Sequence, residues 1–175
     1  MCVPVNYIYH AVPKMDNNVF LSAQIIDWTG LNLLSGNASL YYQGTFIGVS
    51  YLNTDMASDT LNVSLGRDRN IVITREGNKL LKDKILVGNN VKETIGWDIT
   101  VKNNKTTNIH IIIEDQFPVS EKKSIEVQPL DYNGAKLEEK TGKLTWDLML
   151  NGGERKVMNF KYSVKYPRDF NFVAE

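Results

Sequence analysis

Apolar and polar residues alternate with a period of two along most of this chain. In residues 143–150, KLTWDLML, the apolar positions run from Leu144 to Leu150 on every second residue. The same alternation runs through residues 59–66, DTLNVSLG, and residues 157–166, VMNFKYSVKY. Successive side chains of a β-strand point to opposite faces, so this pattern is typical of strands with one buried face. No window of helical length carries an apolar stripe, and the sequence predicts an all-β fold.

Turn-forming residues separate the alternating runs. Asn151-Gly152-Gly153 is the strongest hairpin signal, and Gln43-Gly44 predicts a second hairpin between SLYY and TFIGVSYL. The segment SLGRDRN, residues 64–70, predicts a hairpin connection between TLNVSLG and NIVITR. Counting the runs gives roughly ten to twelve short strands, at about the spacing expected of β-sandwiches.

The pattern weakens at residues 77–84, GNKLLKDK, which are polar and suggest a boundary. Residues 83–175 hold enough strands and turns for an antiparallel β-sandwich of the immunoglobulin-like type. Residues 1–82 supply additional N-terminal strands. The pattern leaves open whether these form a sheet of their own or extend the downstream one.

Composition narrows the function classes. The chain has 175 residues, 42% of them hydrophobic, and 20 basic residues balance 20 acidic ones. This neutral balance gives no electrostatic footprint for nucleic acid. Cys2 is the single cysteine, so no disulfide framework or cysteine metal cluster is expected. There is no apolar run long enough to span a bilayer and no phosphate or dinucleotide fingerprint, so no cofactor is expected.

Glu114 and Asp115, in HIIIEDQFPVS, are the sharpest candidates for chemistry. Adjacent strand residues point to opposite faces, so these two carboxylates cannot simply face each other across a cleft. His110 shares a face with Glu114, but Ile112 separates them and no third metal ligand is in sequence range. Pro118 favours the structural interpretation, in which the acidic pair marks the end of a strand.

Arg67, Asp68 and Arg69 form a compact charge triplet in the SLGRDRN turn. Two arginines could clamp a phosphate or carboxylate, whereas the structural interpretation is a turn with solvated charges. Of the adjacent pair Tyr41 and Tyr42, one should face inward and one outward, and we select Tyr42 together with the triplet as the candidate surface contact. The three tryptophans, at positions 28, 97 and 146, lie in strand-like runs and are expected in the core.

Four blocks in sequence order resemble a known family. They are DWTGLNLLSGNASLYYQGTFIGVS, LNVSLGRDRNIVITR, WDITVKNNKTTNIHIIIEDQFPVSEKKSIEV and GKLTWDLMLNGGERKVMNFKYSVKYP. Together they resemble the C-terminal β-rich domain of the mucoidy-inhibitor-A-like proteins, a domain of unknown function. Ser35 departs from the pattern, in which we expect proline, and this should loosen a turn.

The resemblance implies a module without established enzymatic activity or catalytic residues. Members usually carry an N-terminal domain and a helical stretch before this part, so the chain resembles an excised C-terminal portion beginning at an added or internal Met1. Bacterial members commonly begin with an export signal, which implies an extracytoplasmic location.

Three functions follow from the residues and the resemblance. The first is a non-enzymatic module for protein–protein or cell-envelope interaction, with an exposed strand edge as the expected contact. The second is a glycan-binding module, which needs an exposed aromatic side chain. The third is a hydrolase using Glu114, Asp115 or His110, which needs those side chains to converge in one pocket. The oligomeric state and the binding partner stay open.

Overall fold

The computed structural model describes residues 5–26, 28–31, 33–42, 44–54 and 60–170. Within these ranges the chain forms thirteen β-strands and two short 3-10 turns, with no α-helix, so the predicted all-β fold is confirmed. Cys2 and Gln43 lie outside the described residues.

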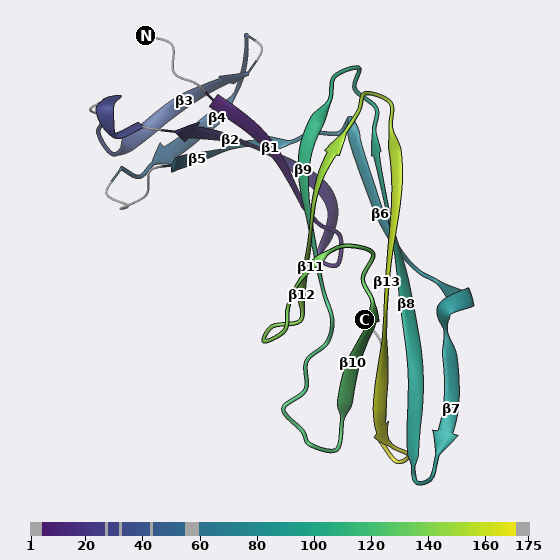
Figure 1. Cartoon of the computed structure of the whole chain (residues 1–175). Helices are drawn as coiled ribbons and strands as arrows, with labels where there is room; N and C mark the ends of the chain where they lie inside the picture. The colour runs from purple at the N-terminus through teal and green to yellow at the C-terminus, as the bar shows by residue number, and fades with distance from the viewer. Residues whose placement is uncertain (1–4, 27, 32, 43, 55–59, 171–175) are drawn as a thin grey trace.

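Most of the strands belong to two large sheets (Figure 1). The first sheet has the order β11 (Lys136–Glu138), β12 (Lys143–Leu150), β9 (Ile109–Gln116), β1 (Val5–Val12), β2 (Asp16–Ile26), β5 (Thr60–Arg67). The second has the order β10 (Glu126–Asp131), β13 (Arg155–Pro167), β8 (Asn90–Asn103), β6 (Ile71–Gly77), and β7 (Asp83–Val87) also pairs with β8. The strands β3 (Gly36–Tyr42) and β4 (Thr45–Leu52) form a separate hairpin. The 3-10 turns are η1 (Trp28–Leu31) and η2 (Lys79–Leu81).

The two large sheets enclose one hydrophobic core, to which every second residue of the central strands contributes. The first sheet supplies Tyr9, Leu21, Ile111, Ile113, Leu144, Trp146 and Leu150, and the second supplies Ile73, Ile99, Val101, Met158, Phe160, Tyr162 and Val164. Leu144, Trp146 and Leu150 on β12, and Met158, Phe160, Tyr162 and Val164 on β13, are members of the alternating runs, so the period-two pattern correctly identified the buried face of these two strands. The indole nitrogen of Trp146 donates a hydrogen bond to the carbonyl oxygen of Asn133 at 3.2 Å.

The N-terminal strands extend the downstream sheets. β1 pairs with β9 in parallel, and the other strand pairs are antiparallel. β6 and β7 lie on either side of residue 82, and both pair with β8. The division expected at residue 82 therefore falls within one continuous sheet.

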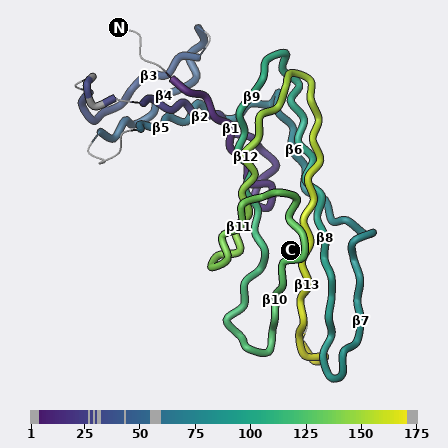
Figure 2. The backbone as a smooth tube through the Cα atoms, viewed as in Figure 1, coloured from purple at the N-terminus to yellow at the C-terminus, as the bar shows by residue number. Residues whose placement is uncertain are grey.

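The end of the first sheet formed by β1, β2 and β5 projects away from the second sheet and carries the β3–β4 hairpin (Figure 2). A second, smaller core joins them there, with Ala23, Trp28, Leu61 and Val63 buried and Leu40 and Leu52 of the hairpin packed against them. One face of the first sheet is thus covered by the second sheet over part of its length and by the hairpin over the rest. We call the hairpin and this end of the first sheet the arm.

One predicted hairpin is confirmed and two are wrong. β3 pairs with β4 as expected. Asn151-Gly152-Gly153, however, connects β12 of the first sheet to β13 of the second, so these strands are not hairpin partners. Gly152 lies against the carbonyl oxygen of Thr106, and Gly153 has φ +77° and donates from its backbone N to Lys105 O at 3.0 Å. These glycines therefore lie in a connection that crosses between the two sheets. The SLGRDRN turn also crosses between sheets, from β5 to β6, so β5 and β6 are not hairpin partners either.

Candidate functional site

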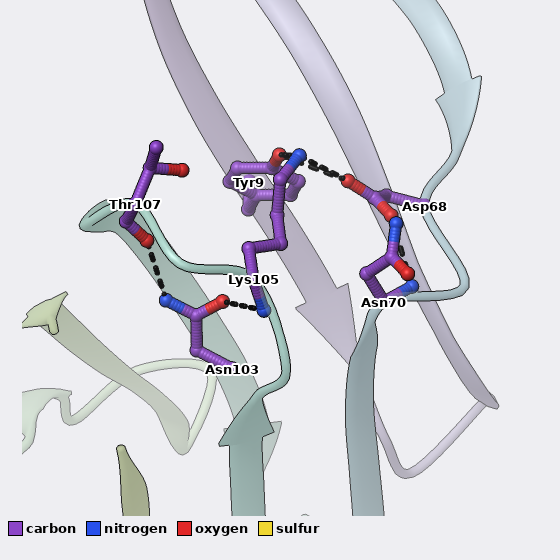
Figure 3. A network of polar contacts seen from close by, with 6 residues as sticks. All are labelled: Tyr9, Asp68, Asn70, Asn103, Lys105 and Thr107. Carbon is purple, nitrogen blue, oxygen red and sulfur yellow. Dashed lines mark hydrogen bonds and ion pairs between the residues drawn. The ribbon is translucent and has the colours of Figure 1, made fainter. Parts of the chain in front are cut away.

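A polar network lies where β1 and the β5–β6 and β8–β9 connections meet (Figure 3). The Lys105 ammonium donates to Asp68 Oδ2 at 2.8 Å and to the Tyr9 hydroxyl oxygen at 2.9 Å. The Tyr9 hydroxyl donates to the same Asp68 oxygen at 3.0 Å. Asp68 Oδ1 accepts from the backbone N of Asn70 at 2.9 Å. Both oxygens of this carboxylate are therefore used within the network.

Asn103 fixes the loop that carries Lys105. Its side chain is fully buried, and its amide oxygen accepts from the Lys105 backbone N at 3.0 Å. Its amide nitrogen donates to the carbonyl oxygens of Thr107 and Asn151, both at 2.9 Å. A buried side-chain amide with these partners is well satisfied, and it ties the β8–β9 connection to the β12–β13 connection.

The network holds its acid and its base in their charged forms. Burial alone would raise the pKa of Asp68, but hydrogen bonds from Lys105, Asn70 and Tyr9 outweigh it and lower that pKa below 3.8. Burial alone would lower the pKa of Lys105, but the hydrogen bonds to Asp68 and Tyr9 raise it above 10.5. Burial raises the pKa of Tyr9 above 10.0, with the Lys105 contact opposing it. At neutral pH the arrangement is an ion pair with a neutral phenol.

The predicted triplet separates into one inward and two outward side chains. Asp68 is partly buried in the network, whereas Arg67 and Arg69 are exposed on either side of it. Both arginines line a pocket of about 280 Å³ together with Asn17 and Asn18 of β2. Neither guanidinium has a carboxylate within 4.0 Å among the described residues.

Glu114 and Asp115 point to opposite sides of the first sheet. Glu114 lies on its outer face and pairs with the Lys143 ammonium at 2.6 Å, whereas the Asp115 side chain is fully buried between the sheets. His110 pairs instead with Asp147 at 2.5 Å. Glu114 and Asp115 both line a pocket of about 300 Å³, but their carboxylates lie on opposite sides of the sheet and His110 is not part of the pocket lining. The three residues of the hydrolase hypothesis therefore do not converge in it. β9 ends at Gln116, two residues before the proline.

Asp115 forms a buried ion pair that joins the two sheets. Its Oδ2 accepts from Nε of Arg75, on β6, at 2.8 Å, and the Arg75 side chain is only 9% exposed. The Arg75 guanidinium carbon lies 3.6 Å from the ring centroid of Trp97. Asp115 Oδ1 also accepts from the backbone N of Gln116 at 2.7 Å. This arrangement supports the structural interpretation of the acidic pair.

The two histidines of the chain lie on neighbouring strands of the first sheet, since His10 is in β1 and His110 in β9. Burial lowers the pKa of His10 below 6.5, and the proximity of Glu114 opposes that shift while His110 adds to it. Across the described residues, no three His, Cys, Asp or Glu side chains gather in a way that could hold a metal ion.

The outer face of the β3–β4 hairpin exposes a cluster of large apolar side chains. Its exposed fractions are 68% for Tyr41, 54% for Phe46, 62% for Val49 and 64% for Tyr51. A register shift after Leu40 sets Tyr41 opposite Phe46, and their ring centroids are 5.5 Å apart. We call these four residues the hairpin face.

The outward member of the tyrosine pair is Tyr41. Tyr42, the predicted surface contact, is instead partly buried against the main core, and its ring packs edge-on against Tyr7 with centroids 5.7 Å apart. Alternation requires one inward and one outward residue, but it does not say which is which. The structure assigns the exposed role to Tyr41.

The hairpin face has a sequence signal that alternation alone does not reveal. No charged residue occurs from Trp28 to Thr54, in a chain that is 23% charged overall. Strands that face solvent usually carry charges, so an uncharged run marks the hairpin as unusual. Ser35 closes its open end, since its hydroxyl lies 2.8 Å from that of Thr54 and accepts from the Thr54 backbone N at 3.0 Å. The serine thus supplies contacts that a proline could not.

The fold and these surfaces define an all-β protein with two facing sheets and a projecting arm. No helix in the described ranges has the length and apolar character of a membrane span. The chain belongs to the family described as Domain of unknown function (DUF4139), whose model matches residues 9–168.

One curated relative is Protein F37C4.5 of Caenorhabditis elegans, which is 24% identical over 174 residues. The match covers 90% of this chain and 31% of the relative, so the chain spans about a third of that protein's length. No solved structure matches the chain.

Proposed function

We propose that this protein is a non-enzymatic interaction module that binds another protein through the hairpin face. The observation that carries the proposal is the exposed, uncharged cluster of Tyr41, Phe46, Val49 and Tyr51. Contiguous exposed apolar side chains mark interaction sites in soluble proteins, and tyrosine and phenylalanine are enriched at protein interfaces.

The fold does not need these side chains for its own stability. The inward residues of the hairpin, Leu40 and Leu52, already pack into the second core. Both outer edges of the hairpin also lack a strand partner among the described residues, since β3 and β4 pair only with each other. An edge without proline or charge is competent to accept a further strand.

The absence of charge indicates the chemistry of the partner. An uncharged face offers no ion pair to a charged partner surface. Burying charged groups of the partner against apolar side chains would cost desolvation free energy. We therefore expect a protein surface of apolar and uncharged polar side chains. The resemblance supports a more specific assignment, in which the chain is the C-terminal domain of a mucoidy-inhibitor-A-like protein with an immunoglobulin-like body acting at the cell envelope.

Site-specific photocrosslinking in cells tests the proposal. A photoreactive side chain at position 41 or 51 of the full-length protein should yield a discrete crosslinked protein. Position 149 is the matched control, because Met149 is apolar and 66% exposed but lies on β12, outside the arm. The purified partner should then bind the wild type and lose most of its affinity for the V49S/Y51S variant. Equal crosslinking at position 149, or binding that survives this substitution, would refute the proposal.

A glycan ligand is the second candidate, favoured by the two exposed tyrosine rings on one face. Stacking on a sugar requires the aromatic ring, whereas protein docking requires mainly apolar area. The Y41L/Y51L variant should therefore retain a protein partner. If Y41L/Y51L binds neither ligand while the wild type binds a glycan probe, the glycan is favoured.

A further inference from the structure

The pocket beside Asp68 has the composition of an anion site. It lies at the junction of the two large sheets, where β5 of the first sheet passes into β6 of the second. The turn is well fixed, because the Asp68 backbone N donates to Val19 O at 3.0 Å and the Asn70 N donates to Asp68 Oδ1. Arg67 and Arg69 therefore extend from a stable turn.

The charges around this pocket do not cancel locally. Asp68 separates the two arginines in sequence, but its carboxylate is occupied by Lys105, Tyr9 and the Asn70 amide. Asp16, on β2, accepts a hydrogen bond from the Asn18 side chain. Neither carboxylate lies within 4.0 Å of the Arg67 or Arg69 guanidinium. Among the described residues that line the pocket, Arg67, Arg69 and Asn17 are thus the polar side chains without a hydrogen bond or ion pair.

We propose that Arg67 and Arg69, with Asn17, bind a phosphate group. One guanidinium in its forked geometry saturates the two oxygens of a carboxylate, whereas a phosphate monoester offers three oxygens and a charge near −2. Two guanidiniums match that charge and that number of acceptors. The pocket, at about 280 Å³, is large enough for a phosphate and a small attached group.

Lys105 serves this site by positioning. It neutralises Asp68, which would otherwise be free to pair with either neighbouring arginine and to repel an anion. The network below the turn and the phosphate site at its surface are therefore parts of one arrangement. The site is separate from the hairpin face, so either proposal can fail without the other.

Titration of the isotope-labelled full chain with inorganic phosphate, followed by amide resonances, tests the site. We expect saturable shifts at Asn17, Asp68 and Arg69, and a loss of affinity of about ten-fold or more in the R67Q/R69Q variant. The control is R155Q/R168Q, which removes the same charge from two other exposed arginines. Its affinity for phosphate should equal that of the wild type.

A second arm distinguishes a free phosphate from a lipid headgroup. Phosphatidylcholine vesicles with and without phosphatidic acid are sedimented with the protein. Binding to the phosphatidic acid vesicles alone, abolished by R67Q/R69Q, would assign the site to a phosphomonoester headgroup. If neither inorganic phosphate nor phosphatidic acid gives a saturable response, the proposal is overturned. It is also overturned if R155Q/R168Q loses as much phosphate affinity as R67Q/R69Q, because the binding would then reflect general electrostatic attraction.

Discussion

Replacing Asp115 with alanine should destabilise this protein far more than neutralising its neighbour Glu114. Asp115 is fully buried and balances the charge of Arg75, which is 9% exposed. Without the carboxylate, an uncompensated guanidinium stays between the sheets and the Gln116 backbone N loses its acceptor. Removing one partner of a buried ion pair typically costs about 3–5 kcal/mol.

The structure places the expected loss in the lower part of that range. The Arg75 guanidinium keeps its contact with the Trp97 ring after the substitution, and an aromatic face partly stabilises a cation. We therefore expect D115A to lose about 3–4 kcal/mol, within the range for one broken buried pair. E114Q breaks a half-exposed pair with Lys143, and surface pairs contribute about 0–1 kcal/mol.

Urea unfolding followed by tryptophan fluorescence measures both values. With a slope near the upper end of about 1–3 kcal/mol/M, D115A should lower the unfolding midpoint by about 1–1.5 M. The D115N variant keeps an oxygen acceptor for Gln116 and should lose less than D115A. The double variant R75M/D115A should lose less than the sum of the two single variants, because it leaves no unpaired charge.

Two results would refute this reasoning. A loss in D115A within about 1 kcal/mol of that in E114Q would mean that the Arg75–Asp115 pair behaves as a solvated surface pair. Additive losses in the double variant would mean that the two charges do not interact. Either result would leave the acidic pair of HIIIEDQFPVS without the structural role that the buried geometry gives to Asp115.

Two further predictions concern the crossing connections. The pKa of Asp68 is lowered in the folded state, so its contribution to stability is present above pH 3.8 and is lost as the pH falls through its folded pKa. The difference in unfolding free energy between the wild type and K105M should therefore shrink below pH 3.8. A difference that does not change with pH in the acid range would contradict the ion pair between Asp68 and Lys105. Gly142 has φ +71°, and an added Cβ would lie 2.5 Å from the Phe117 carbonyl oxygen, whereas Gly134 has φ +72° and open space around it. At Gly134 only the left-handed backbone is unfavourable for alanine, at a cost of about 1–2 kcal/mol. G142A should therefore lower the thermal midpoint clearly more than G134A. Equal shifts would mean that the contact with the Phe117 carbonyl oxygen adds no cost.

The period-two pattern predicted which side of most strands is buried. Leu61 and Val63 are buried while Asn62 and Ser64 are exposed, as expected. Along the sequence, Arg75 is also two residues from Ile73 and in phase with Ile71, and Asp115 is in phase with Ile111 and Ile113, although this spacing entered none of the sequence-based predictions. A charged residue at an inward position on each of two strands was therefore visible in the sequence, but the pairing of one with the other was not.

Strand partners could not be obtained from the sequence in the same way. A glycine-containing turn indicates that the chain reverses, and the same residues suit a hairpin or a crossing between facing sheets. Gly152 and Gly153 belong to the second kind. The Thr106 carbonyl group leaves no space for a side chain at Gly152, and Gly153 donates a backbone hydrogen bond to Lys105 O, and both partners are far away in the chain. The role of Lys105 in the Asp68 network could not be predicted either, because Asp68 is 37 residues away in the sequence.

The composition of the hairpin is the feature that folding explains least. Its inward positions, Leu40 and Leu52, need to be apolar because they close the second core. Its outward positions contact no core, and polar residues there would leave the second core intact and reduce the risk of edge-to-edge association. Tyr41, Phe46, Val49 and Tyr51 instead keep an apolar surface on a strand pair whose edges have no strand partner in the described part of the chain. The fold does not require that surface, and this is the physical basis of our proposal that it binds another protein.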